Sequence, residues 1–182
     1  MVDFYGLFHL DITTINAKTN EKKSTWTTGS VIKGKKMKNE KIYLYLDDTR
    51  TPKEGNWEVV RGYDEFVAHI RLNGLENYEV ISLDHDLGES AMEEYYNNAR
   101  PNFEIDYKNI VEKTGMDCAR WLVAESMTSG IPLPQIYVHS ANPIGSANII
   151  GYVNNYLKNQ RLPTGCVSVT IPHTITIKQF YD

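Results

Sequence analysis

A short apolar run that stops at two adjacent aspartates constrains the fold of this chain more than any other stretch. Residues 42–46 read Ile-Tyr-Leu-Tyr-Leu and are followed directly by Asp47 and Asp48. An apolar run of this length is typical of a strand buried on both faces, as in a parallel sheet between helices. Adjacent carboxylates at its end repel each other, and a bound divalent cation offsets that repulsion. The alternative is a polar turn with solvated acids, because Asp is common in turns.

Two later apolar runs end in a similar way. Residues 80–83 stop at acidic and imidazole groups, and residues 136–138 stop at imidazole, hydroxyl and amide groups. The residues in question are Asp84, His85, Asp86, His139, Ser140 and Asn142. In open parallel sheets, ligands bind outside the carboxyl ends of the strands. Three strands that end in polar groups therefore predict one shared functional site.

Helical periodicity separates these runs. Apolar residues at helical spacing predict helices over 63–72 and 115–127, and Asn142-Pro143 opens another helix in the favoured order of capping residue and proline. We expect free N–H groups at the start of this last helix to point at the site, which suits an anion. Its expected apolar stripe is Ile144, Ala147, Ile150, Val153 and Leu157. The element order predicts an α/β doubly wound parallel sheet whose first crossover helix is missing or reduced.

Two segments stand apart from this pattern. Residues 1–40 hold seven lysines against four acidic residues, and they predict an accessory β-hairpin or a flexible basic leader. The main domain then covers residues 41–182. Within it, the acidic, tyrosine-bearing segment 89–113 is too long for an ordinary connection between a strand and a helix. We expect it to be an insertion that covers the carboxyl ends of the strands.

Composition excludes several classes of protein. A net charge of −4 gives no reason to expect binding to a nucleic-acid backbone. The two cysteines, Cys118 and Cys166, form no CxxC pair, which argues against a disulfide framework and suits a reducing compartment. No run approaches the roughly 18 apolar residues of a membrane span. We therefore expect a cytoplasmic protein with no membrane partner.

The acidic residues point to a hard divalent metal. Asp47, Asp48 and Asp84 supply oxygen ligands that suit Mg²⁺ or Mn²⁺, with Asp86 as a further candidate ligand. Such a metal assists hydrolysis of a phosphodiester by activating water and holding a phosphoryl oxygen. Asp84 is also a candidate nucleophile, because carboxylates form covalent phosphoryl intermediates.

The remaining polar residues are candidates for proton transfer and substrate binding. His85 and His139 can act as general acid or base, or each can serve only as a structural hydrogen-bonding group. Arg50 has two alternative roles, which are to neutralise the acids or to hold a phosphate oxygen. Ser140 and Asn142 are candidates for contacts to the substrate.

These residues resemble a response-regulator receiver domain. Asp47 and Asp48 match its acidic pair, Asp84 matches its phosphoacceptor, and Ser140-Ala141 matches its Thr/Ser-Ala pair. A receiver has Lys-Pro after its last strand, whereas this chain has Ile171-Pro172. The lost lysine argues against ordinary phosphorelay switching.

The closer resemblance is to a divergent, mostly phage and bacterial group, the cyclic-phosphate processing receiver domains. The motifs LDDTRTP, SLDHDLG, TGMD and HSANPIGSAN carry it, over about residues 41–157. The resemblance implies a receiver-like (flavodoxin-like) fold and a metal-assisted activity on nucleotide cyclic phosphates.

We therefore expect a metal-dependent phosphoesterase whose partner is a phosphate-containing small molecule or an RNA end. Cyclic nucleotides, cyclic oligonucleotide signals and RNA 2′,3′-cyclic ends all fit as substrates. Two alternatives remain open at this point. One is a non-catalytic receiver-like module that binds a nucleotide or a protein, and the other is a signalling receiver phosphorylated on Asp84. The sequence assigns no role to residues 1–40 or to His173.

Overall fold

The structure is a computed structural model that describes residues 41–160 and 165–175. The hairpin or leader predicted for residues 1–40 lies outside the described residues. Among those that are described, no helix is both long and apolar enough to cross a membrane.

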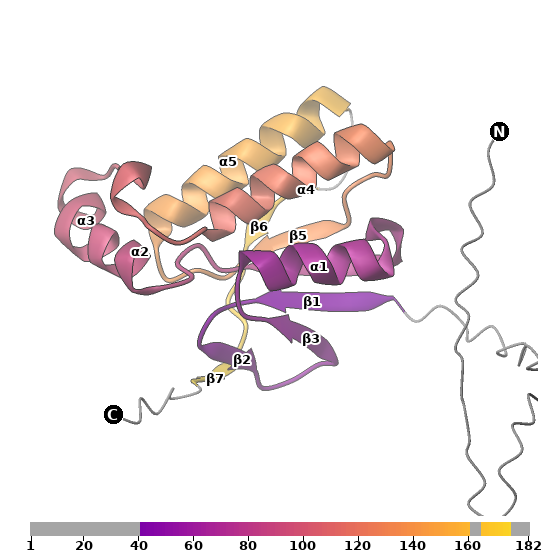
Figure 1. Cartoon of the computed structure of the whole chain (residues 1–182), viewed down its shortest axis with the longest axis horizontal. Coiled ribbons are helices and arrows are strands. Elements are labelled where there is room, and N and C mark those ends of the chain that lie inside the picture. The colour runs from indigo at the N-terminus through magenta and orange to yellow at the C-terminus, as the bar shows by residue number, and fades with distance from the viewer. Residues whose placement is uncertain (1–40, 161–164, 176–182) are drawn as a thin grey trace, which may run out of the picture. The chain divides into compact units, whose positions relative to one another are not determined.

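A five-stranded parallel sheet forms the centre of the domain (Figure 1). The strand order is β3-β1-β4-β5-β6. The strands are β1 (Ile42–Leu46), β3 (Trp57–Val60), β4 (Tyr78–Leu83), β5 (Gln135–Val138) and β6 (Val167–Ser168). The predicted α/β parallel sheet is confirmed.

The three long helices lie side by side on one face of this sheet (Figure 1). They are α1 (Tyr63–Asn73), α4 (Gly115–Ser129) and α5 (Pro143–Gln160). The right-handed crossover rule explains their placement, because β3 to β4, β4 to β5 and β5 to β6 all move in the same direction across the sheet. Only the connection from β1 to β3 moves the other way. It contains the short strand β2 (Arg50–Pro52) and no helix, as predicted for the reduced crossover.

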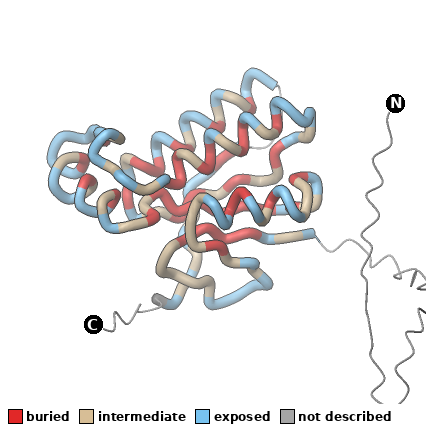
Figure 2. The backbone as a smooth tube through the Cα atoms, in the orientation of Figure 1, coloured by how far each residue is buried: buried red, intermediate tan, exposed pale blue. Residues whose placement is uncertain are grey.

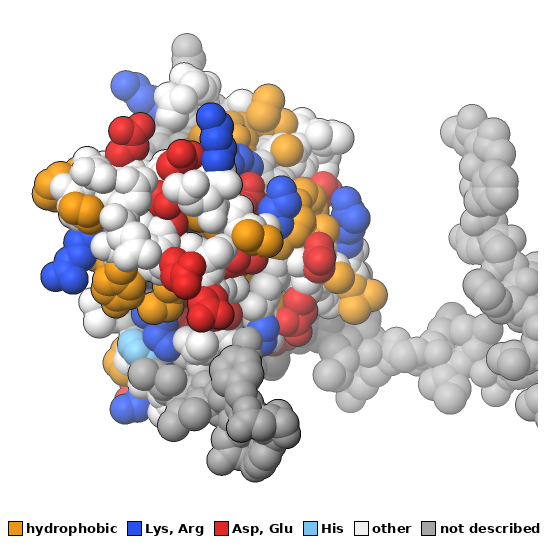
Figure 3. All heavy atoms as spheres, turned by 60° about the vertical axis from the view of Figure 1, so that its left-hand side comes forward, with side chains coloured by type: hydrophobic (Ala, Val, Ile, Leu, Met, Phe, Trp, Pro, Cys, Tyr) orange, Lys and Arg blue, Asp and Glu red, His pale blue; other side chains and the backbone are white. Residues whose placement is uncertain are grey.

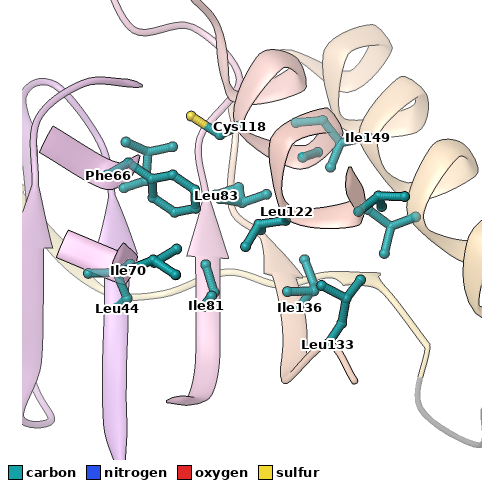
Figure 4. Packing of buried hydrophobic residues seen from close by; sticks show 14 of the residues in the cluster. Leu44, Phe66, Ile70, Ile81, Leu83, Cys118, Leu122, Leu133, Ile136 and Ile149 are labelled. Atoms are coloured by element: carbon teal, nitrogen blue, oxygen red, sulfur yellow. The ribbon is translucent and has the colours of Figure 1, made fainter. Parts of the chain in front are cut away.

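Alternation along the strands divides their side chains between the two faces. Leu44, Ile81, Leu83 and Ile136 point toward the helices and join the apolar core (Figure 4), which also contains Leu46. Buried segments accordingly follow the strands and the inner sides of the helices (Figure 2). The core also includes Phe66, Ile70, Leu122 and Ile149.

The apolar stripe of α5 differs from the predicted one. Val153 and Leu157 are buried as expected, but Ala147 is exposed and Ile149 is buried in place of Ile150. Gly145 and Ser146 complete the buried side. The helix is therefore rotated so that its small residues, rather than its large ones, face the sheet near its N-terminus.

Residues 89–113, which we interpret as an insertion, are mostly helical. The segment contains α2 (Glu89–Glu94), a π-helical turn η2 (Tyr95–Ala99), α3 (Arg100–Asn102) and a 3₁₀ turn η3 (Tyr107–Asn109). The buried Glu94 carboxylate organises it by accepting hydrogen bonds from the Asn98 and Asn109 side chains and from the Asp106 backbone. A second 3₁₀ turn, η1 (Leu75–Asn77), precedes β4.

The C-terminal described segment closes a small second sheet. Strand β7 (His173–Ile175) pairs antiparallel with β2, and Pro52 is the partner of His173. The ring Nδ1 of His173 lies 3.2 Å from the backbone oxygen of Ile171. This histidine therefore belongs to the small β2–β7 sheet rather than to the polar cluster described below.

Candidate phosphoryl and metal site

The register of the sheet brings the predicted polar residues to one level. Leu46 pairs with Leu83, and Leu83 pairs with Val138. The ladder continues one residue further, because Asp84 N donates to Leu46 O and His139 N donates to Leu83 O. Asp47, Asp84 and His139 consequently emerge side by side at the carboxyl edge of the sheet, as the strand-end rule predicts.

Three carboxylates form a group that suits a divalent cation. Asp47, Asp48 and Asp84 each offer an oxygen, and these oxygens lie within 4.8 Å of one another. Asp47 and Asp84 are buried, whereas Asp48 is partly exposed. Asp86 lies outside this group but lines the same cleft. The donor set consists of hard oxygens at the rim of a cleft, which fits Mg²⁺ or Mn²⁺.

Arg50 joins two of the three carboxylates. Its Nε lies 2.6 Å from Asp47 Oδ2 and its Nη2 lies 2.7 Å from Asp84 Oδ2. Arg50 N also donates to Asp47 Oδ1, at 2.5 Å. The neutralising role proposed for Arg50 is thus the one that its contacts display. A cation held by these carboxylates would compete with this guanidinium for the same oxygens.

The environment moves the pKa values of the two buried carboxyl groups in opposite directions. Burial raises the pKa of Asp84, and the opposing effects of Arg50 and of a hydrogen bond from Ser140 only partly offset it. Burial also acts to raise the pKa of Asp47, but hydrogen bonds from His139 and Arg50 outweigh it, so that this pKa is lowered. Asp47 is accordingly the more firmly ionised of the two.

His139 supports Asp47 from the face of the sheet opposite the helices. Its Nε2 lies 3.2 Å from Asp47 Oδ2, its Nδ1 lies 2.7 Å from Ser82 Oγ, and its ring stacks on Tyr45 at 4.0 Å. Burial lowers the pKa of His139, although its bond to Asp47 opposes this. A neutral ring therefore donates from Nε2 to Asp47 and accepts from Ser82. Both nitrogens are engaged, so the geometry gives His139 a positioning role.

The lowered pKa values predict how stability depends on pH. Because His139 and Asp47 have lower pKa values in the folded protein, the unfolded chain binds their protons first as pH falls. The contribution of His139 to stability is present above about pH 6.5 and is lost as the pH falls below it, whereas that of Asp47 is present above about pH 4 and is lost only below that. We expect urea unfolding with a chelator to show the loss from His139 between pH 7.5 and 5.5. The His139→Gln variant should lose less stability over that range, and equal losses would contradict the assignment.

His85 is completely buried and holds two groups of the cleft. Its Nδ1 lies 2.6 Å from Asp86 Oδ1, and its Nε2 lies 3.2 Å from the Tyr107 hydroxyl of the insertion. The ring packs directly against Gly145 at the start of α5. These contacts make His85 a link between β4, the insertion and α5. They do not place either nitrogen beside the carboxylate group.

A matched pair of glycines in α5 tests this packing. A Cβ at position 145 meets the His85 ring at 2.3 Å, whereas a Cβ at position 151 meets nothing within 4 Å. We expect Gly145→Ala to cost about 1–3 kcal/mol of unfolding free energy. Gly151→Ala should instead stabilise the helix by up to about 1 kcal/mol. Urea denaturation measures both, and a stabilising Gly145→Ala would show that His85 does not sit against this helix.

Asn142 and Ser140 shape the loop that leads into α5. Asn142 Oδ1 accepts hydrogen bonds from the N–H groups of Ile144 and Gly145, and its Nδ2 donates to Asp86 Oδ1. Ser140 Oγ accepts from Asn142 N. The expectation of free N–H groups pointing into the site is therefore wrong, because the Asn142 side chain already caps them.

A cleft of about 200 Å³, here called the acidic cleft, opens above these residues. Asp48, Arg50, Asp84 and Asp86 line it from the sheet side, together with Asn142. Met92, Tyr95 and Tyr96 line it from the insertion. Residues of this segment thus line the cleft opposite the residues at the carboxyl ends of the strands.

Several residues of the site were not among the predicted ones. Tyr45 and Ser82 each lie two positions before a site aspartate, so strand alternation places them on the same face as His139. That periodicity is a signal that could have identified them. Arg61 donates to Asp47 O at 2.9 Å and to Arg50 O at 2.7 Å, and Tyr107 bonds to His85. No local pattern marks these two, because their contacts span long sequence separations.

A comparison with known families bears on the same residues. A family model described as the cyclic-phosphate processing Receiver domain matches residues 42–155, which is more than half of the chain. The chain belongs to this family. Comparisons with curated proteins and with solved structures gave no match. The matched range of the cyclic-phosphate processing receiver domain runs from β1 into α5 and includes every predicted site residue.

Proposed function

We propose that this receiver domain is a metal-dependent phosphoesterase that opens a nucleotide cyclic phosphate. The supporting observation is the convergence of Asp47, Asp48 and Asp84 with Arg50 at the rim of a cleft, in a domain of the cyclic-phosphate processing family. A cyclic nucleotide, a cyclic oligonucleotide signal and an RNA 2′,3′-cyclic end remain candidate substrates.

The carboxylates are assigned to the metal and Arg50 to the phosphate. Asp47, Asp48 and Asp84 would hold Mg²⁺ or Mn²⁺, and a bound divalent ion lowers the pKa of coordinated water and neutralises a phosphoryl oxygen. Arg50 bonds to the same carboxylates, Asp47 and Asp84, that would hold the metal. With those carboxylates neutralised, its guanidinium would be able to pair bidentately with two phosphate oxygens, which is the geometry that arginine favours.

Proton transfer is assigned to Asp86 rather than to the two histidines. Both described hydrogen bonds to Asp86, from His85 and Asn142, use Oδ1, and this leaves Oδ2 to accept or return a proton. In the reaction, a water oxygen bonds to phosphorus, the P–O bond to one ribose oxygen breaks, and that oxygen takes up a proton. His85 and His139 act on this chemistry through Asp86 and Asp47, whose positions they hold.

Turnover of the purified chain tests the proposal. We expect 2′,3′-cyclic AMP or another cyclic nucleotide to be converted to a phosphomonoester in the presence of Mn²⁺, as followed by phosphorus NMR. A chelator should abolish the conversion. A chain that binds cyclic nucleotides without opening them would favour the binding module, and labelling of Asp84 by acetyl phosphate would favour the signalling receiver.

A further inference from the structure

A second cleft lies beside the acidic cleft and takes no part in the chemistry proposed above. Its volume is about 450 Å³, within the range of about 300–1,000 Å³ that is usual for small-molecule sites. The insertion forms one side and the first turns of α5 form the other. We call it the aromatic cleft, and its lining includes Tyr95, Arg100, Phe103, Ile144, Ala147 and Asn148.

The two clefts share one lining residue and have others that are adjacent in the sequence. Tyr95 lines both of them. Ala141 and Asn142 line the acidic cleft, and the next two residues, Pro143 and Ile144, line the aromatic one. A ligand whose phosphate lies among the acids can therefore extend directly into the aromatic cleft.

Phe103 has no structural reason to be an aromatic residue. Its backbone is left-handed, with a φ of 60°, and it is the only non-glycine residue with positive φ among those described. Glycine or asparagine is the usual choice at such a position after a helix. Phe103 is also 81% exposed, so burial does not explain the choice of an aromatic residue. A bulky side chain held in an unfavourable conformation at the mouth of a cleft is typical of a ligand contact.

The backbone of the neighbouring turn directs a second aromatic ring to the same place. Residues Tyr95–Ala99 form a π-helix, a form that is rare and is frequent at functional sites. Tyr95 lines the aromatic cleft, whereas Tyr96 lines only the acidic one. Figure 3 brings this end of the molecule forward and shows hydrophobic side chains among charged ones on its surface.

We propose that the aromatic cleft binds the base of a nucleotide whose phosphate lies in the acidic cleft. Aromatic rings stack on any of the nucleobases, because every base has a π-face. A guanidinium such as that of Arg100 stacks on a base in the same way. The Asn148 amide adds a polar group, oriented by a 3.1 Å hydrogen bond from its Nδ2 to Tyr107. The position of the phosphate rests on the proposed function, but the base site does not.

Binding of three probes to the full chain tests this inference. Adenosine, AMP and inorganic phosphate are titrated calorimetrically with Mn²⁺ present, first into the parent protein and then into Phe103→Gly. Glycine accepts the left-handed backbone, so this variant removes the ring without harming the fold. We expect this variant to bind adenosine and AMP roughly 5- to 150-fold more weakly, which is the usual effect of losing one stacking ring. Its affinity for phosphate should be unchanged. Val111→Ala is the matched control, because Val111 is an exposed apolar residue of the insertion that lines neither cleft.

The outcomes separate this inference from the proposed function. AMP binding no tighter than phosphate in the parent, or AMP and adenosine binding within twofold of the parent in Phe103→Gly, overturns the base site. Adenosine binding that depends on Phe103 supports the base site even if phosphate does not bind and no cyclic nucleotide is opened. In that case the proposed function fails and the base site stands.

Discussion

The Arg50→Met variant is expected to lose roughly 3–5 kcal/mol of unfolding free energy when a chelator is present. Arg50 contacts the oxygens of Asp47 and Asp84, and its side chain is only 14% exposed. Its removal leaves two buried carboxylates without their described cation. Urea denaturation at pH 7.5 measures the loss.

Mn²⁺ should restore much of this stability, because a metal and Arg50 neutralise the same oxygens. A metal at about 100 times its dissociation constant stabilises the folded state by about 2.7 kcal/mol. Arg120→Met is the control, since its 3.4 Å contact with Asp117 is partly exposed and should be worth less than about 1 kcal/mol. If chelated Arg50→Met were as stable as the parent, Arg50 would not be the counter-ion of these acids.

Asp48→Asn is expected to have the largest effect on metal binding and turnover. Loss of an outer partner of a metal site costs about 10–100-fold in affinity, and loss of a direct ligand should exceed that. Asp48 is partly exposed and Asp47 is fully buried, so Asp48→Asn should cost less stability than Asp47→Asn. We expect Mn²⁺ binding to disappear from calorimetric titrations and turnover to fall to background, while the unfolding transition remains cooperative.

Asp86→Asn is the matched variant for this experiment. Asp86 lines the same cleft but lies outside the three-carboxylate group. It should keep its affinity for Mn²⁺ within a few-fold of the parent and should lose turnover, because we assign proton transfer to it. Equal loss of Mn²⁺ binding in both variants would show that Asp86 is a metal ligand, as the sequence analysis suggested.

Much of the fold and of the site follows from local sequence patterns. The apolar runs that stop at Asp47, Asp84 and His139 are three parallel neighbours, and strand register then brings their polar ends together. The alternation of side chains along a strand also predicts that Tyr45 and Ser82 lie on the same face of the sheet as His139. The position of the insertion over the cleft also follows from its length and its place after β4.

The roles of individual site residues depend on contacts that no local pattern encodes. His85 looks like a catalytic group in the sequence, but Gly145 and Tyr107 enclose it from distant segments. Asn142 caps its own helix and so occupies the N–H groups that an anion was expected to use. Whether Arg50 neutralises acids or holds phosphate depends on what else is bound, which a sequence does not state.

Residues near the two ends of the insertion are hydrogen-bonded to each other. The Glu112 carboxylate accepts hydrogen bonds from the Ser90 hydroxyl and the Ala91 backbone, and Val111 N donates to Ser90 Oγ. Because its two ends are fastened together, the residues between them can be exchanged without moving a strand. We therefore expect that a grafted insertion would change which ligands the two clefts accept, while Tyr107 keeps its bond to His85 and Asp47, Asp48 and Asp84 stay at the ends of the strands.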